Sequence, residues 1–244
     1  MRYFKNVKEA LFEVERDLIE MGINVWPKSM QNKRVDIDPQ YQTKELVGYG
    51  FRVNNALGSE AMEAVSKFYD VPMETVKEYC LAEMRDRISD VPSNPGTSWR
   101  HRKEVWEPFL DKKGKFDYTY SERLHGLLTF LRETLVADPA SRQAVVSVWR
   151  PLDLAQTGGK SRIPCSLHYQ FLLRPEGDKL ILHVLYSMRS CDIYTHFGYD
   201  VALAIMMGGA LGKSLPYPIK AVHLTMFIGS LHAYRKDYEP RGVF

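Results

Sequence analysis

The stretch LHYQFLLRPEGDKLILHVLYSM, residues 167–188, contains two runs of leucine, β-branched and aromatic residues. Leu167–Leu173 and Leu180–Met188 are each typical of a β-strand. Pro175–Asp178 between them combines proline, glycine and aspartate, which favour a tight turn. We therefore predict a β-hairpin here, and the rest of the fold can be predicted outward from it.

The sequence on either side of this hairpin predicts two further strands and a buried helix. Ala144–Trp149 and Val222–Ile228 have strand composition, and Gly229 follows the second. Tyr199–Leu211 is almost wholly apolar, so we expect a buried helix that ends at Gly212.

The first half of the chain is predicted to be mainly helical. Apolar residues recur every three to four positions in Val7–Met21. Pro72 stands where a helix begins, and Met73–Ile88 follows with good helix formers. Ser121–Leu135 places its leucines on one side of a third helix. Together these elements predict an α+β fold, a single domain over residues 1–244 with one large, mostly antiparallel or mixed sheet flanked by helices.

Composition excludes several classes of protein. The chain has 244 residues, of which 45% are hydrophobic and 26% charged, so it is not a disordered chain. No apolar run is long enough to span a bilayer, and the N-terminus has no apolar signal core, so we expect a cytoplasmic protein with no membrane partner. Three widely spaced cysteines argue against a disulfide framework. A net charge of +3 gives no electrostatic case for a dedicated nucleic-acid binder.

The most irregular segment runs from Asp90 to Gly114 and is rich in proline, glycine and charge. A loop this long is uncommon in a compact domain unless it has a function. Trp99–Lys115 interleaves basic and aromatic residues, which leaves open a module that binds single-stranded nucleic acid. Three acidic residues in that segment weaken this alternative.

No pattern in the sequence predicts a metal or phosphate-loop site. Neither CxxC nor HExxH occurs, so we expect no metal. Gly208–Ser214 has some likeness to a phosphate loop, but it lies at a predicted helix end instead of between a strand and a helix.

Cys165 is a candidate nucleophile. It follows a glycine-rich loop, Gln156–Lys160, and immediately precedes a predicted strand, with Lys160 and Arg162 nearby. Neighbouring positive charge stabilises a thiolate, the nucleophilic form of cysteine. From spacing alone, a small buried residue at a strand start is the simpler alternative.

Two further groups lie at predicted strand ends. In Arg189-Ser190-Cys191-Asp192 an arginine beside a hydroxyl suits a phosphate or carboxylate, although an ion pair between Arg189 and Asp192 explains it equally well. His232 and Tyr234 follow Gly229-Ser230, and strand alternation would point both side chains the same way.

These groups occur in the order found in one known family. The chain resembles thymidylate synthases and the related pyrimidine-nucleotide hydroxymethylases, most strongly from Pro139 to Tyr234. The likeness runs through five motifs in the family's order: Pro139-Ala140-Ser141-Arg142, Pro164-Cys165, Arg189-Ser190-Cys191-Asp192, Asp200, and Gly229-Ser230-Leu231-His232-Ala233-Tyr234.

The resemblance implies roles for these residues. Cys165 is the nucleophile that adds to carbon 6 of a pyrimidine, which lets carbon 5 attack the one-carbon unit of 5,10-methylene-tetrahydrofolate. Arg189 and Ser190 bind the phosphate, joined by Arg142 from the partner subunit of a homodimer that forms through the sheet. His232 and Tyr234 contact the sugar. Asp192 faces both the base and the folate.

Further upstream the likeness implies a smaller set of residues. Counting back from Tyr120, Trp106 falls at the position of a folate-side tryptophan and Glu83 at that of a catalytic glutamate. Tyr120 itself lies on the folate side. Arg34 is the candidate for an N-terminal phosphate ligand.

Asp200 is the informative departure from the synthases, which carry asparagine there to bind uracil. A carboxylate only accepts hydrogen bonds, which suits the amino group of cytosine. The alternative is that Asp200 merely caps the helix that follows Gly198. Deoxycytidylate hydroxymethylases also carry aspartate at this place, and phage members share the Gly-Ser-Leu-His pattern of residues 229–232.

Two more departures bear on the reaction. Gln143 replaces a second phosphate arginine, and the chain stops twelve residues after His232, sooner than the synthases. Gln143 bears on which sugar phosphate is bound. The short tail predicts a wetter site, in which water favours hydroxymethylation over methylation. The expected enzyme is a deoxycytidylate 5-hydroxymethyltransferase in the cytoplasm of a bacterium or of a phage-infected host. A deoxycytidylate methyltransferase and a cytidylate hydroxymethylase remain alternatives.

Overall fold

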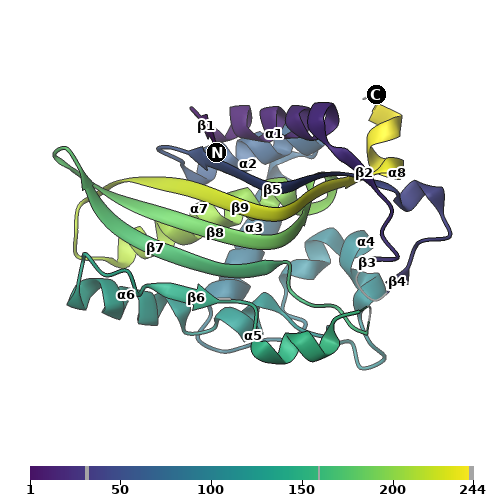
Figure 1. Ribbon diagram of the computed structural model, residues 1–244. Coiled ribbons are helices and arrows are strands. Elements are labelled where there is room, and N and C mark those ends of the chain that lie inside the picture. The colour runs from purple at the N-terminus through teal and green to yellow at the C-terminus, as the bar shows by residue number, and fades with distance from the viewer. Residues whose placement is uncertain (31–32, 159, 242–244) are drawn as a thin grey trace.

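A computed structural model describes residues 1–30, 33–158 and 160–241, so Gly159 of the glycine-rich loop lies outside the described part. A long mixed sheet runs through the molecule (Figure 1). In the described residues it contains seven strands in the order β1-β5-β9-β8-β7-β6, with β2 paired to β5. The strands are β1 (Arg2–Phe4), β2 (Ile23–Val25), β5 (Thr43–Val53), β6 (Val145–Ser147), β7 (Ser166–Glu176), β8 (Lys179–Asp192) and β9 (Ile219–Tyr234). A short hairpin, β3 (Ser29–Met30) with β4 (Lys33–Arg34), stands apart from it.

Helices α1, α2, α3 and α7 lie on one side of this sheet, and the side that faces the viewer in Figure 1 carries none of the described helices. The helices are α1 (Val7–Met21), α2 (Gly58–Tyr69), α3 (Met73–Ile88), α4 (Lys103–Trp106), α5 (Tyr120–Leu124), α6 (Leu127–Ala137), α7 (Gly198–Ser214) and α8 (Arg235–Tyr238). No helix of the described chain has the length and apolar character needed to cross a membrane.

The predicted hairpin is confirmed, and its two strands are longer than the sequence indicated. β7 and β8 pair antiparallel from Ser166/Met188 to Glu176/Lys179. Alternate residues of β8 are buried on the helix side, among them Val184 and Tyr186, as expected of a sheet with one covered face. The predicted helices Val7–Met21 and Met73–Ile88 have the predicted bounds.

One helix prediction is wrong. Ser121–Leu135 is not continuous, because the chain leaves the helix at His125 and starts a second helix after Gly126. Gly126 has φ of +70°, a left-handed conformation that residues with a Cβ adopt at a cost. The result is a bend that separates α5 from α6.

The predicted loop Asp90–Gly114 is a series of short helical turns. Ser98–Arg102 and Glu107–Phe109 form 3-10 turns on either side of α4. These turns lie at the end of the molecule toward which β8 and β9 run, and they supply one wall of the site described next (Figure 1).

Candidate active site

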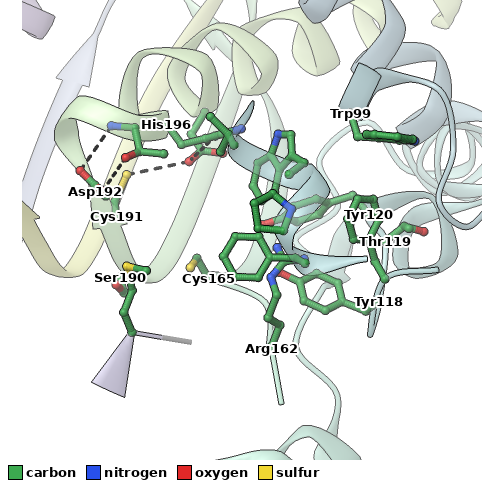
Figure 2. A pocket seen from close by; sticks show the side chains of 18 of the residues that line it. Trp99, Tyr118, Thr119, Tyr120, Arg162, Cys165, Ser190, Cys191, Asp192 and His196 are labelled. Carbon is green, nitrogen blue, oxygen red and sulfur yellow. Dashed lines mark hydrogen bonds and ion pairs between the residues drawn. The ribbon is translucent and has the colours of Figure 1, made fainter. Parts of the chain in front are cut away.

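A cavity of about 570 Å³ lies where β8 and β9 end. Its walls come from these two strands, the start of β7, α3, α7 and the irregular segment between α3 and α5. Ten of the predicted site residues line it: Glu83, Trp106, Tyr120, Cys165, Arg189, Ser190, Asp192, Asp200, His232 and Tyr234. Segments distant in sequence therefore meet in one hollow (Figure 2).

The parallel pairing of β8 and β9 brings two of the sequence motifs together. Ser190 lies opposite Ser230 and Asp192 lies opposite His232. Gly229 permits the close approach of the two strands, because a Cβ at this position would lie 2.8 Å from the carbonyl oxygen of Arg189. Both strands end at the cavity, so their polar residues face the same ligand.

Cys165 is half-buried in the cavity wall, so the alternative of a sealed core residue is not supported. The Arg189 guanidinium donates from Nε to the carbonyl of Pro164 (2.9 Å) and from Nη2 to that of Ile163 (3.2 Å). Its Nη2 lies 3.7 Å from Cys165 Sγ. Arg189 thus holds the segment before the cysteine and places a positive charge beside the sulfur, which favours a reactive thiol.

The other two cysteines differ from Cys165 in their surroundings. Burial raises the pKa of Cys80 to about 12. Burial, together with the negative charge of Asp200, raises the pKa of Cys191 well above its usual value. Both thiols therefore remain protonated at neutral pH, which leaves Cys165 as the candidate nucleophile.

Asp200 lies in the first turn of α7 with only 4% of its surface exposed, yet it reaches the cavity. Its Oδ2 is 3.2 Å from His196 Nδ1 and 3.9 Å from Cys191 Sγ, and its Oδ1 accepts from the Tyr186 hydroxyl at 3.4 Å. Among the described residues, the first amide of α7, that of Gly198, donates to the Tyr69 hydroxyl at 2.9 Å and not to Asp200, so helix capping is not the role of this carboxylate. A carboxylate has about four acceptor positions, and these contacts leave room for a ligand's donor.

Tyr79 and His196 form a chain of polar contacts that ends at the Asp200 carboxylate. Tyr79 Oη is 2.9 Å from His196 Nε2, and the other ring nitrogen of His196 faces Asp200. His196 belongs to a π-helical turn, Ile193–Phe197, whose first amides are capped by Asp192. Such turns are frequent at functional sites, and this one aims His196 at Asp200.

Glu83 is buried at the cavity wall and tightly held. Its Oε1 accepts from Arg87 Nε at 2.8 Å, and its Oε2 accepts from the Ser98 hydroxyl at 2.5 Å. Arg87 is fully buried, with its guanidinium 4.2 Å from the centre of the Tyr120 ring. The orientation of this carboxylate is therefore determined by α3 and the 3-10 turn at Ser98.

Comparison with known proteins agrees with this arrangement. The family model for thymidylate synthase matches residues 13–241. The chain belongs to the thymidylate synthase family. Thymidylate synthases of Listeria monocytogenes serotype 4b and Haloferax volcanii are each 22% identical to it, over 92% and 80% of this chain and 62% and 68% of theirs. The chain thus spans less than two thirds of the Listeria protein's length.

The fold is that of the same family. The thermostable thymidylate synthase A from Bacillus subtilis matches with a TM-score of 0.65 at 14% identity, covering 98% of this chain and 83% of that one. The predicted α+β architecture, a mixed sheet flanked by helices, is therefore confirmed.

Two residues predicted from the family likeness do not line the cavity of this family member. Arg142 is exposed just before β6 and contributes to a separate shallow hollow formed by residues 134–143. Arg34 is 76% exposed and pairs with Asp36, with 2.7 Å between its Nε and the Asp36 Oδ1. The position of Arg142 outside its own chain's cavity is compatible with a role toward a second subunit.

The alternative of an ion pair between Arg189 and Asp192 is not supported, because each makes other contacts. Arg189 donates to main-chain carbonyls, and Asp192 accepts from Tyr194, Thr195 and the Thr195 hydroxyl. His232 and Tyr234 both reach the cavity, with ring centres 5.4 Å apart.

Trp106 lies in an aromatic wall that the sequence did not reveal as a unit. Phe109, Phe116 and Tyr118 complete this wall, and Arg162 lies among the four rings. These aromatic side chains line the cavity, so the structure gives no support to a separate strip that binds single-stranded nucleic acid. Among the described residues, no group of three or more histidine, cysteine or acidic side chains could hold a metal ion.

Proposed function

We propose that this chain transfers a one-carbon unit from 5,10-methylene-tetrahydrofolate to carbon 5 of deoxycytidylate and forms 5-hydroxymethyl-deoxycytidylate. The observation that carries this proposal is the buried carboxylate of Asp200, which lines the same cavity as Cys165 and Arg189.

Asp200 is proposed to recognise the base. The 4-amino group of cytosine donates hydrogen bonds, whereas oxygen 4 of uracil only accepts them. An ionised carboxylate only accepts. Uracil at this site would therefore place two acceptors against each other in a buried position, at a cost of about 1–3 kcal/mol.

Cys165 is proposed to attack carbon 6 of the bound base. Its sulfur forms a bond to that carbon, and the electron pair of the 5,6 double bond makes carbon 5 nucleophilic. Arg189 assists in two ways, because it holds Pro164 and Ile163 and lies beside the sulfur. With Ser190 it also offers donors to the nucleotide phosphate, while His232 and Tyr234 line the space for the sugar.

The folate is proposed to lie against the aromatic wall near Trp106 and Tyr120, with Asp192 between the two substrates. When bound, it supplies the one-carbon unit. The residues present fit such a ligand, because a planar ring system can stack on this wall and the cavity volume is typical of small-molecule sites.

The hydroxymethyl product is proposed from the likeness of Asp200 and Gly229-Ser230-Leu231-His232 to the deoxycytidylate hydroxymethylases. The cavity lining also contains Glu83 and Ser98, whose hydroxyl donates to this carboxylate. A carboxylate held as firmly as that of Glu83 can orient a water molecule and accept its proton.

Mass spectrometry tests this function directly. The protein is incubated with deoxycytidylate and methylene-tetrahydrofolate, and a gain of CH2O in the nucleotide is expected. A gain of CH2 would mean methylation, and modification of deoxyuridylate alone would contradict the proposal.

Asp200→Asn tests the base recognition in the same assay. We expect the ratio of kcat/KM for deoxycytidylate over deoxyuridylate to fall by about 10- to 100-fold, because an amide can donate to oxygen 4 of uracil. If the variant ranks the two nucleotides as the parent does, Asp200 does not select the base.

Arg142 provides a test of the homodimer. If it serves the partner's site, Cys165→Ser and Arg142→Ala should each be inactive alone. Mixed one to one after subunit exchange, they should recover roughly a quarter of the parent activity, because half of the dimers are mixed and each of these has one intact site. Continued inactivity of the mixture, with exchange verified by native mass spectrometry, would place Arg142 outside any shared site.

A further inference from the structure

Arg162 is a buried cation in the cavity wall. Only 8% of its surface is exposed, although it lies three residues before Cys165 in an irregular segment. Four rings surround its guanidinium carbon, at 4.5 Å from the centre of Phe109, 5.2 Å from Trp106, 5.5 Å from Tyr118 and 5.7 Å from Phe116.

The guanidinium of Arg162 has no carboxylate within ion-pair distance among residues 1–30, 33–158 and 160–241. Its Nε is buried and has no hydrogen-bond partner there. Asp117 lies nearby but accepts from the main-chain N–H of Arg162, at 2.7 Å. Rings attract the charge from their faces, but they do not satisfy N–H donors in the guanidinium plane.

The fully buried Arg87 and the largely buried Arg123 are both paired with carboxylates. Arg87 donates to Glu83, and Arg123 donates to both carboxylate oxygens of Asp153, at 3.0 and 2.7 Å. A buried charge without an acceptor is costly, so natural proteins rarely keep one without a ligand or a function. Unlike these two, Arg162 has no carboxylate partner among the described residues, and it lies at the cavity.

We propose that Arg162 donates hydrogen bonds to an oxygen of the one-carbon donor and is a specificity-determining residue for that substrate. This inference rests on the proposed function. The oxygen belongs either to the carbonyl of the pterin ring or to a carboxylate of the glutamate tail; both are planar acceptors that suit a guanidinium fork.

The arrangement of the cavity favours the folate over the nucleotide as the partner of Arg162. Figure 2 shows Ser190, Cys191 and Asp192 on one side of Cys165, and Arg162 with Tyr118, Thr119 and Tyr120 on the other. The first side already contains Arg189 as a donor for the nucleotide phosphate. A stacked ring on the second side would bring its edge toward Arg162.

Calorimetric titration of tetrahydrofolate onto the protein saturated with deoxycytidylate tests this inference. Arg162→Met keeps the length and apolar packing of the stem but removes the donors. We expect its Kd for tetrahydrofolate to rise about 10- to 100-fold, with an intermediate value for Arg162→Lys and little change in the Kd for deoxycytidylate. Arg123→Met is the matched control, because Arg123 also packs over Tyr118, at 5.5 Å, but is not part of the cavity lining.

Tetrahydropteroate, which lacks the glutamate, distinguishes the two acceptors. An equal loss of affinity for both ligands in Arg162→Met assigns the ring carbonyl, whereas a loss for tetrahydrofolate alone assigns the tail. Unchanged affinity for both, in a variant that melts at the parent temperature, overturns the inference.

If Arg162→Met does not fold, the inference can still be tested on the parent protein by NMR. In a spectrum of 15N-arginine-labelled protein, the Nε–H signal of Arg162, assigned by its absence in Arg162→Lys, should move with tetrahydrofolate and not with deoxycytidylate alone. If the Nε–H signal of Arg162 does not shift although the protein binds tetrahydrofolate, the inference is overturned. If the parent does not bind tetrahydrofolate at all, the proposed function itself fails.

Discussion

Cys165→Ser is expected to lower turnover of deoxycytidylate by at least about 10³-fold while the Kd for the nucleotide changes little. A serine hydroxyl keeps the approximate size and position of the side chain but is a much weaker nucleophile than a cysteine thiol. Arg189, Ser190 and His232 would still be available to bind the nucleotide, because all three line the cavity and their positions do not require the Cys165 sulfur. Steady-state kinetics and a binding titration on the same preparation separate the two effects.

Cys80→Ala is the matched control for this experiment. Cys80 is buried in α3 and does not line the cavity, and burial raises its pKa to about 12. Its removal should cost stability but preserve kcat. A Cys165→Ser variant with near-normal turnover would remove this residue from the chemistry, and a dead Cys80→Ala variant that remains folded would point to another thiol.

Arg87→Met is expected to destabilise the protein by ~3–5 kcal/mol and to impair catalysis. Arg87 is fully buried and donates to Glu83, which is itself buried. Without the guanidinium, the Glu83 carboxylate would keep only the Ser98 hydroxyl among the donors described here. Denaturant unfolding of the variant and the parent measures the loss.

The double variant Glu83→Leu/Arg87→Met separates stability from catalysis. Replacement of both charges removes the unpaired carboxylate, so part of the lost stability should return. Activity should not return, because the proposed acid–base group, Glu83, is gone. Arg85→Met, on the exposed side of α3, should change stability by less than about 0.5 kcal/mol. Equal stability of Arg87→Met and Arg85→Met would show that the buried pair contributes nothing.

The sequence predicted those helices and strands whose residue pattern is typical of their structure. The β7–β8 hairpin and α1 were predicted correctly from their apolar patterns, and α3 from Pro72 and the helix formers that follow it. The long strand β5, next to the edge strand β1, was missed. Its sequence, TKELVGYGFRV, contains charged residues and two glycines, since only its helix-facing positions need to be apolar.

The site residues also divide into those with a sequence motif, which were predicted, and those without one, which were not. Residues at the ends of β8 and β9 were predicted from their motifs, and the structure brings them together with Cys165 and Asp200. Tyr79, His196 and Arg162 were not predicted as site residues, since each reaches the cavity through packing between distant segments. Proximity of Arg162 to Cys165 in sequence was a usable signal, but its aromatic surroundings come from residues 106–118, which no local pattern connects to it.

Gly229 has a consequence for how this enzyme can diversify. With 2.8 Å between a hypothetical Cβ and the Arg189 carbonyl oxygen, even alanine would push the two strands apart and displace Ser190 and His232 from their present positions. Asp200, the proposed base contact, lies on α7 and the aromatic wall lies before α5, so we expect that either can change without disturbing the pairing of β8 with β9. The absence of a side chain at Gly229 thus keeps the residues at the ends of β8 and β9 in register while other cavity residues vary.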